Sequence, residues 1–302
     1  MVCPIMPTKI GEVVKMKLGC STVLFNQSDL YGALQHISWA GYEGADLSDI
    51  SIVRHIELNT KQSYIHEVKA IVEKHGLELF SIDTEDLGKT EEDKIKYLTK
   101  VFDVAQKLSI PVVMPNFLGK PGGKEVIKRN INYIKKLIEQ AESRGVTLGI
   151  KVHLGSPVDK TATLLQILDG INSPALGVTL DTREFSRAGE DIAEAISKVG
   201  KRIVHVHVRD YPRREQIPTA ISSAFTGFGH EAWVPPVEQQ IPGRGGIDFL
   251  RILRLLKDAG YDKAVDLVMV GAGTYPLSRQ MGIAAEARGY LNRCLQEVNK
   301  ND

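Results

Sequence analysis

The chain has 302 residues, of which 43% are hydrophobic and 25% charged, and its formal net charge is +1. Basic and acidic residues alternate along the chain without forming a basic stripe, which argues against a nucleic-acid partner. No apolar run approaches the roughly 18 residues of a membrane helix, so we expect no membrane association. Length alone fits one large domain or two smaller ones.

The cysteines and the first residues of the chain indicate in which cellular compartment the protein is expected. Cys3, Cys20 and Cys294 lie far apart, with no CxxC spacing, which argues against a disulfide framework and suits a reducing compartment. The first sixteen residues lack the sections of a signal peptide. We therefore expect a cytoplasmic protein with an extension over residues 1–16 and one domain over residues 17–302.

Short runs rich in Val, Ile and Leu alternate with amphipathic helical segments along the chain. This pattern is typical of parallel strands joined by helical crossovers. In chain order, the predicted strands are Lys17–Ser21, Gly44–Leu47, Leu77–Ile82, Pro111–Met114, Val146–Val152, Leu176–Leu180, Ile203–Val208 and Ala264–Val270.

The signals between these strands favour one domain. Ser28 or Asp29 opens one predicted helix and Thr90 opens another, and Gly residues follow the ends of several helices. No linker interrupts the alternation, and no glycine-rich phosphate turn follows the first strand, as a doubly wound open sheet would require. The sequence predicts a single α/β domain, a (β/α)8 TIM barrel.

The connection from Tyr211 to Arg244 has no sustained helical period and is longer than barrel loops usually are. It follows the seventh predicted strand and therefore emerges at the C-terminal face, where barrel enzymes hold their active sites. A lid and an oligomer contact are the two interpretations, and we favour a lid. Within this connection, Trp233 is a candidate for stacking on a sugar ring.

Strand residues alternate between the two faces of a sheet, so parity predicts which side chains enter the barrel. The valines of Ile203–Val208 form an outward set, which leaves His205, His207 and Arg209 facing inward. The same rule turns Lys151, His153 and Asp181 inward and places Glu184 just above, in the loop. Any one of these residues would fit a buried ion pair, but their convergence at strand ends favours a functional site.

Several segments resemble those of a known family when taken in order: Lys17–Thr22, Ala40–Asp46, Gly145–Leu148, Leu180–Thr182, His205–Asp210, Pro242–Asp248 and Ala259–Asp262. Their order and spacing resemble the xylose-isomerase-like barrels, which include sugar phosphate isomerases and epimerases, inosose dehydratases and type IV apurinic endonucleases. The resemblance covers about the whole barrel. It implies a divalent cation held by a Glu, an Asp, a His and a second Glu on the last four strands.

Transferred residue by residue, this metal site is incomplete. Asp181 and His207 match two ligand positions, whereas Lys151 and Val268 occupy the two glutamate positions, and Glu184 replaces a usual His. A lysine ammonium has no lone pair and repels a cation, so we expect no tightly bound metal. A weak divalent cation (Mn, Co, Zn or Mg) at Asp181 and His207 stays open.

The resemblance then suggests a role for each residue. Lys151, held between Asp181 and Glu184, would replace the charge of the metal and stabilise an enediolate, while His205 or His207 moves the proton. A Schiff-base lysine is the second route. His153, Arg209, Asn116 and Trp233 are the candidate substrate contacts.

The leading hypothesis is a sugar or keto-sugar isomerase or epimerase that abstracts a proton next to a carbonyl. A lyase or dehydratase acting on a keto-sugar uses the same enolate chemistry, and a non-catalytic barrel that serves as a binding module or subunit is the rival from another class. An endonuclease would require additional histidines for a multi-metal site. We also expect a homo-oligomer, as is common in the resembled family.

Overall fold

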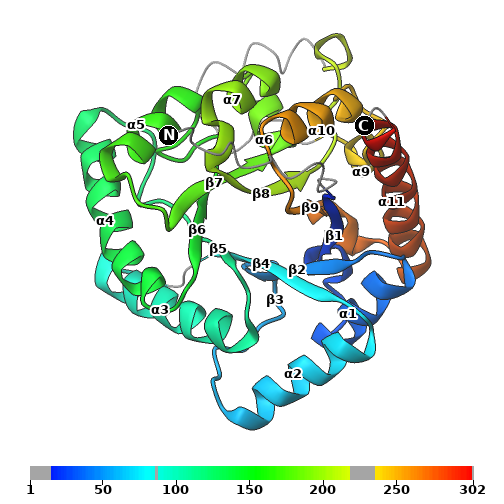
Figure 1. Cartoon of the computed structure of the whole chain (residues 1–302), viewed down its shortest axis with the longest axis horizontal. Helices are drawn as coiled ribbons and strands as arrows, with labels where there is room; N and C mark the ends of the chain where they lie inside the picture. The colour runs from blue at the N-terminus through cyan, green and yellow to red at the C-terminus, as the bar shows by residue number, and fades with distance from the viewer. Residues whose placement is uncertain (1–14, 86–87, 218–234, 301–302) are drawn as a thin grey trace, which may run out of the picture.

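The computed structural model describes residues 15–85, 88–217 and 235–300. Parallel strands in this part of the chain close into a barrel that helices surround (Figure 1). Strand β1 pairs with both β2 and β9, which closes the ring, and the predicted TIM barrel is confirmed. The strands are β1 Lys17–Ser21, β2 Gly44–Ile50, β3 Val53–Arg54, β4 Glu78–Thr84, β5 Val112–Met114, β6 Thr147–Ile150, β7 Leu176–Asp181, β8 Ile203–Val208 and β9 Ala264–Leu267.

The helices lie outside the ring of strands, and their starts follow local capping chemistry. Asp29 caps α1 by accepting the Gly32 N–H, and Thr90 and Asp93 form a reciprocal capping box on α3. The helices are α1 Leu30–Trp39, α2 Gln62–Lys74, α3 Glu91–Leu108, α4 Lys124–Glu142, α5 Thr161–Ile171, α6 Thr182–Arg187, α7 Ile192–Val199, α9 Val237–Gln240, α10 Phe249–Asp258 and α11 Leu277–Asn299, with 3₁₀ turns η1 Thr22–Phe25, η2 Gly200–Arg202, η3 Arg214–Gln216 and η5 Val270–Thr274. Within the described ranges, no helix is long and apolar enough to cross a membrane.

Three strands, β2, β6 and β9, end at residues other than the predicted ones. Strand β2 extends to Ile50 because its end forms an antiparallel pair with β3, which the prediction missed. Strand β9 stops at Leu267, three residues before its predicted end at Val270, which is instead the first residue of the 3₁₀ turn η5. Strand β6 ends at Ile150, so Lys151 lies directly after the strand.

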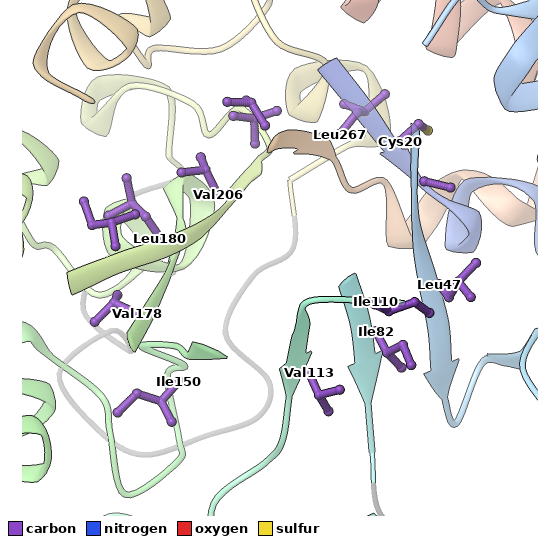
Figure 2. Close-up of a cluster of buried hydrophobic side chains, with 14 of the residues drawn as sticks. Cys20, Leu47, Ile82, Ile110, Val113, Ile150, Val178, Leu180, Val206 and Leu267 are labelled. Carbon is purple, nitrogen blue, oxygen red and sulfur yellow. The ribbon is translucent and has the colours of Figure 1, made fainter. Parts of the chain in front are cut away.

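The outward strand residues form the main core between the sheet and the helices. Val178, Leu180 and Val206 are fully buried in this layer, as parity predicted, and Figure 2 shows comparable side chains around the ring. Burial of such aliphatic side chains supplies about 1.5–3 kcal/mol each. The alternation leaves the polar residues of the same strands inside the barrel.

Asp210 joins the two ends of the long connection after β8. Its carboxylate accepts the backbone N–H groups of Tyr211, Gly243, Gly245 and Ile247 at 2.8–3.0 Å. Gly243 has a φ of +95°, which a residue with a side chain rarely adopts. The segments His205–Asp210 and Pro242–Asp248 thus support each other at the C-terminal face. Trp233 lies outside the described residues, so its predicted contact stays a prediction.

Candidate active site

Two levels of polar side chains lie inside the barrel. The lower level, here called the floor, consists of Asp46, Ser81, His205, His207 and Asp266. His205 Nε2 lies 3.1 Å from Ser81 Oγ and 2.9 Å from Asp266 Oδ2, and Ser81 donates to Asp46 Oδ1 at 2.7 Å. These contacts cross from β8 to β2, β4 and β9, which shows that His205 faces inward as predicted.

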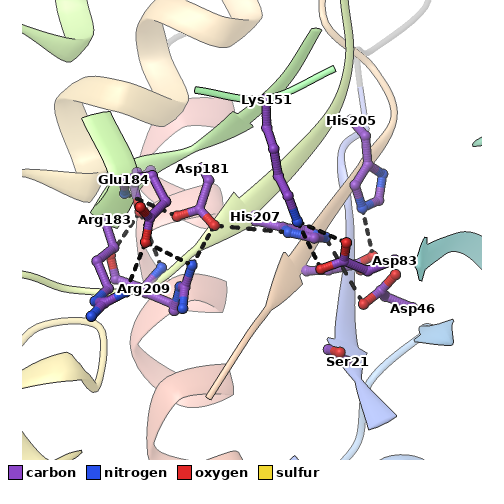
Figure 3. Close-up of polar contacts among 12 residues, drawn as sticks. Ser21, Asp46, Asp83, Lys151, Asp181, Arg183, Glu184, His205, His207 and Arg209 are labelled. Carbon is purple, nitrogen blue, oxygen red and sulfur yellow. Dashed lines mark hydrogen bonds and ion pairs between the residues drawn. The ribbon is translucent and has the colours of Figure 1, made fainter. Parts of the chain in front are cut away.

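His207 lies at the upper edge of the floor, between Asp46 and Asp181 (Figure 3). Its Nε2 is 3.9 Å from Asp46 Oδ2 and its Nδ1 is 4.0 Å from Asp181 Oδ2, so neither ring nitrogen has a hydrogen-bond partner among the described residues. Burial and the neighbouring His205 lower the pKa of His207 well below its usual value. Burial, with Asp83 and Asp266 nearby, raises the pKa of Asp46. Both shifts favour uncharged side chains.

The upper level, here called the mouth, consists of the charged groups above His207. Lys151 Nζ donates to both carboxylate oxygens of Asp83, at 2.7 and 2.8 Å. The ammonium of Lys151 was expected between Asp181 and Glu184, and this prediction is wrong because the ammonium is bound to Asp83. Burial alone would lower the pKa of Lys151, but Asp83 outweighs it and the pKa is raised. A protonated lysine is a poor Schiff-base nucleophile, which argues against the second route.

Asp181 and Glu184 are instead paired with arginines. Arg209 Nη2 lies 2.6 Å from Asp181 Oδ2 and 3.4 Å from Glu184 Oε1, and Arg183 Nη1 lies 2.7 Å from the same Glu184 oxygen. Arg187 Nη1 approaches Glu184 Oε2 at 3.6 Å. Burial would raise the pKa of Glu184, but Arg209, His153 and the other arginines lower it to about 2. Burial and neighbouring Arg209 lower the pKa of Arg183 to about 10.

A cavity of about 420 Å³ opens beside the mouth and brings three predicted residues together: Lys151, His153 and Asn116. Its wall also includes Glu85 and Lys120, from the loops after β4 and β5. This volume lies within the range of small-molecule sites. His205 and His207 do not line the cavity, so the predicted proton carriers lie apart from the predicted substrate contacts.

Five polar residues of this site are not among the predicted catalytic, substrate-binding or metal residues. Asp83 and Asp266 share the inward parity of Ser81 and His207 on their strands, so the period of two was an available signal. Asp46 follows the same rule on β2. Arg183 and Arg187 are one residue before and three residues after Glu184 on the same helix, so their spacing was an available signal too.

Three residues at the predicted metal positions have contacts or side chains that bear on metal binding. Asp181 is bound to Arg209 and accepts the Glu184 N–H, while Lys151 is bound to Asp83. Val268 is a buried valine and offers no lone pair. No three His, Cys, Asp or Glu side chains within the described residues are arranged to hold a metal, including Asp181, Glu184 and His207.

The model of the family described as the xylose isomerase-like TIM barrel matches residues 34–294. The chain belongs to this family. An inosose dehydratase of Clostridium perfringens is 26% identical over 161 residues, covering 52% of this chain and 51% of that protein. An inosose dehydratase of Clostridium botulinum is 22% identical over 277 residues, covering 86% and 87%. The chain thus spans about half the length of the curated relatives that it matches at 26% identity.

Several solved structures superpose over most of the chain. A D-tagatose 3-epimerase-like protein has a TM-score of 0.71 at 19% identity, covering 95% of this chain and 99% of its own. The IolI protein, which has a bound zinc atom, has a TM-score of 0.72 at 17% identity, with coverage of 92% and 99%. At these identities the likeness shows the fold, and the zinc belongs to that protein.

Proposed function

We propose that the protein is an enzyme that isomerises or epimerises a small sugar or keto-sugar by abstracting a proton next to a carbonyl. The observation that carries this proposal is the position of Lys151. Its ammonium is fixed by Asp83 and lines the same cavity as His153 and Asn116. A fixed positive charge in a partly buried cavity is suited to stabilising a negative oxygen.

In this proposal, His153 replaces His205 and His207 as the proton carrier, because His153 lines the cavity and the other two do not. The imidazole takes the proton from the carbon next to the carbonyl, and the electron pair of that C–H bond moves onto the carbonyl oxygen. Lys151 stabilises the resulting enediolate. Return of the proton to the neighbouring carbon gives an isomer once the hydroxyl proton of that carbon has moved to the former carbonyl oxygen. Delivery of a proton from water to the opposite face of the original carbon gives an epimer, and His153 releases its own proton to solvent. Asn116 binds a sugar hydroxyl.

Lys151 supplies the positive charge at the level where the family resemblance places a metal-bound glutamate. We base this on the donors present: an ammonium, an arginine-bound Asp181 and Val268 do not make a four-ligand site. The proposed steps therefore use only side chains of this chain.

A dehydratase is the second candidate, because the curated relatives at 22–26% identity include several inosose dehydratases. The same enediolate would expel a hydroxyl from the next carbon as water once that hydroxyl has gained a proton. Isomerases and dehydratases therefore share the first step and differ in the fate of the enediolate.

The test is incubation of the purified protein with ketohexoses, ketopentoses and inososes in deuterated water, followed by NMR. We expect deuterium at the carbon next to the carbonyl, together with an isomer or epimer. Deuterium incorporation with loss of water would assign the dehydratase. Absence of exchange with every compound, from a protein that unfolds cooperatively, would contradict the proposed chemistry.

A further inference from the structure

Three arginines converge on one carboxylate beside the proposed site. Arg183 and Arg209 both approach Glu184 Oε1, at 2.7 and 3.4 Å, and Arg187 approaches Oε2 at 3.6 Å. In Figure 3, Arg183 and Arg209 lie beside Glu184, and Lys151 lies on the opposite side of Asp181. Asp181 is the second acid in contact, through Arg209. The group thus contains three guanidinium cations and two carboxylates.

This arginine cluster, defined as Arg183, Arg187 and Arg209, holds more buried donors than the described residues satisfy. The Nε–H of each arginine is buried without a hydrogen-bond partner in the described ranges. The hydroxyl of Tyr211 is buried beside them and is unpartnered on the same basis. Arg183, Arg209 and Tyr211 are 6%, 8% and 4% exposed, so solvent does not replace the missing partners.

An unpaired buried donor carries a desolvation penalty of about 1–3 kcal/mol, more when it is charged. A cluster that served only to hold the fold would be expected to match cations with acids, since buried ion pairs stabilise weakly even when complete. In this cluster, three arginines face two carboxylates, so one positive charge is in excess. The three planar guanidinium groups supply the donors. Such groups bind the oxygens of carboxylates and phosphates in a bidentate manner.

None of the three arginines lines the cavity, but two residues that do line it are within electrostatic reach of Arg187 or Arg209. His153 lines the cavity wall and lies close enough to Glu184, Arg209 and Arg187 for their charges to act on its imidazole. Lys151, on the same wall, is within electrostatic reach of Arg209 and Asp181. A ligand that extended past His153 would move toward Arg187 and Arg209.

We propose that the arginine cluster and Tyr211 bind an anionic group of the substrate, so that the substrate is an acidic sugar derivative with a carboxylate or a phosphate. This inference rests on the proposed function, which places a sugar derivative in the cavity. The excess guanidinium charge accepts the anion, Tyr211 donates to it, and His153 and Lys151 face the carbonyl end.

The test is calorimetric titration of the full chain with inorganic phosphate, D-glucose 6-phosphate, D-glucuronate and D-glucose. We expect saturable binding of at least one anion and at least tenfold weaker binding of D-glucose. Binding of glucuronate alone identifies a carboxylate, and binding of the two phosphates alone identifies a phosphate. Absence of saturable binding by every anion, up to tens of millimolar, would overturn the inference.

Variants locate the binding. Arg187→Gln is expected to weaken anion binding about tenfold, the loss of one charge-assisted contact, and Arg183→Gln by at least as much. Arg202→Gln is the matched control, because Arg202 is an outward residue paired with Asp169. If Arg183→Gln does not fold, Arg187→Gln alone tests the site. The contact of Arg187 with Glu184 is the longest of the three, so its loss should disturb the fold least. Unchanged binding in folded Arg187→Gln and Arg183→Gln would place the anion elsewhere and refute the assignment.

Failure of this inference is distinguishable from failure of the proposed function. Deuterium exchange into a neutral keto-sugar without anion binding would retain the function and remove the anion site. Anion binding that depends on Arg187, without exchange in any acidic or neutral sugar, would retain the site and remove the proposed chemistry.

Discussion

At the floor, Asp46 and His207 are fully buried, and both ring nitrogens of His207 lack a hydrogen-bond partner among the described residues. At the mouth, by contrast, Lys151 and Arg209 each bind a carboxylate within 2.8 Å. Burial favours the neutral forms of Asp46 and His207, whereas close pairing favours the charged forms of Lys151 and Glu184.

The difference indicates separate tasks for the two levels. Charged groups that line a cavity interact with a ligand, whereas neutral groups sealed beneath them contribute mainly to packing and hydrogen bonding. Substitutions at the mouth should therefore change turnover more than stability. Substitutions at the floor should do the opposite.

The largest expected effect is that of Lys151→Met, which removes the charge from the cavity wall. Turnover, measured by deuterium exchange, should fall about 10²–10³-fold, as when one oxyanion-stabilising donor is removed. Lys120→Met is the matched control, because Lys120 lines the same cavity but is exposed at its rim. Equal losses in the two variants would show that Lys151 has no special role.

The second effect concerns the support of the mouth by Asp210. Asp210→Asn places an amide N–H₂ against backbone N–H donors and should lower the free energy of unfolding by about 2–3 kcal/mol. We expect the melting temperature to fall by about 3–5 °C. Asp262→Asn, at an exposed aspartate, is the control. A melting temperature equal to that of the control would mean that the four hydrogen bonds do not support the connection.

The smallest effect is expected at the floor. Ser81→Ala removes the hydroxyl that contacts both Asp46 and His205 and should cost about 1–2 kcal/mol of stability. The kcat and KM values should change less than about threefold, because Ser81 is fully buried and does not line the cavity. A large loss of kcat with unchanged stability would assign the floor a part in the chemistry.

Strand parity carried much of the site prediction. His205, His207 and Asp181 face inward as predicted, because alternation along a strand is a local property of the backbone. The same rule, applied to β4 and β9, would have found Asp83 and Asp266. The barrel itself followed from the regular alternation of strand and helix signals.

Partner choice, by contrast, depended on the tertiary structure. Lys151 binds Asp83, which lies 68 residues earlier in the chain, and this pairing follows from the positions of β4, β5 and β6 around the ring. Arg209 reaches Asp181 and Glu184 because the end of β8 lies beside the end of β7 and the start of α6. The sequence by itself thus determined the barrel and the inward faces, through local periodicity. The charge pairing of the mouth was decided by strand order and helix packing, which bring distant residues within a few ångströms.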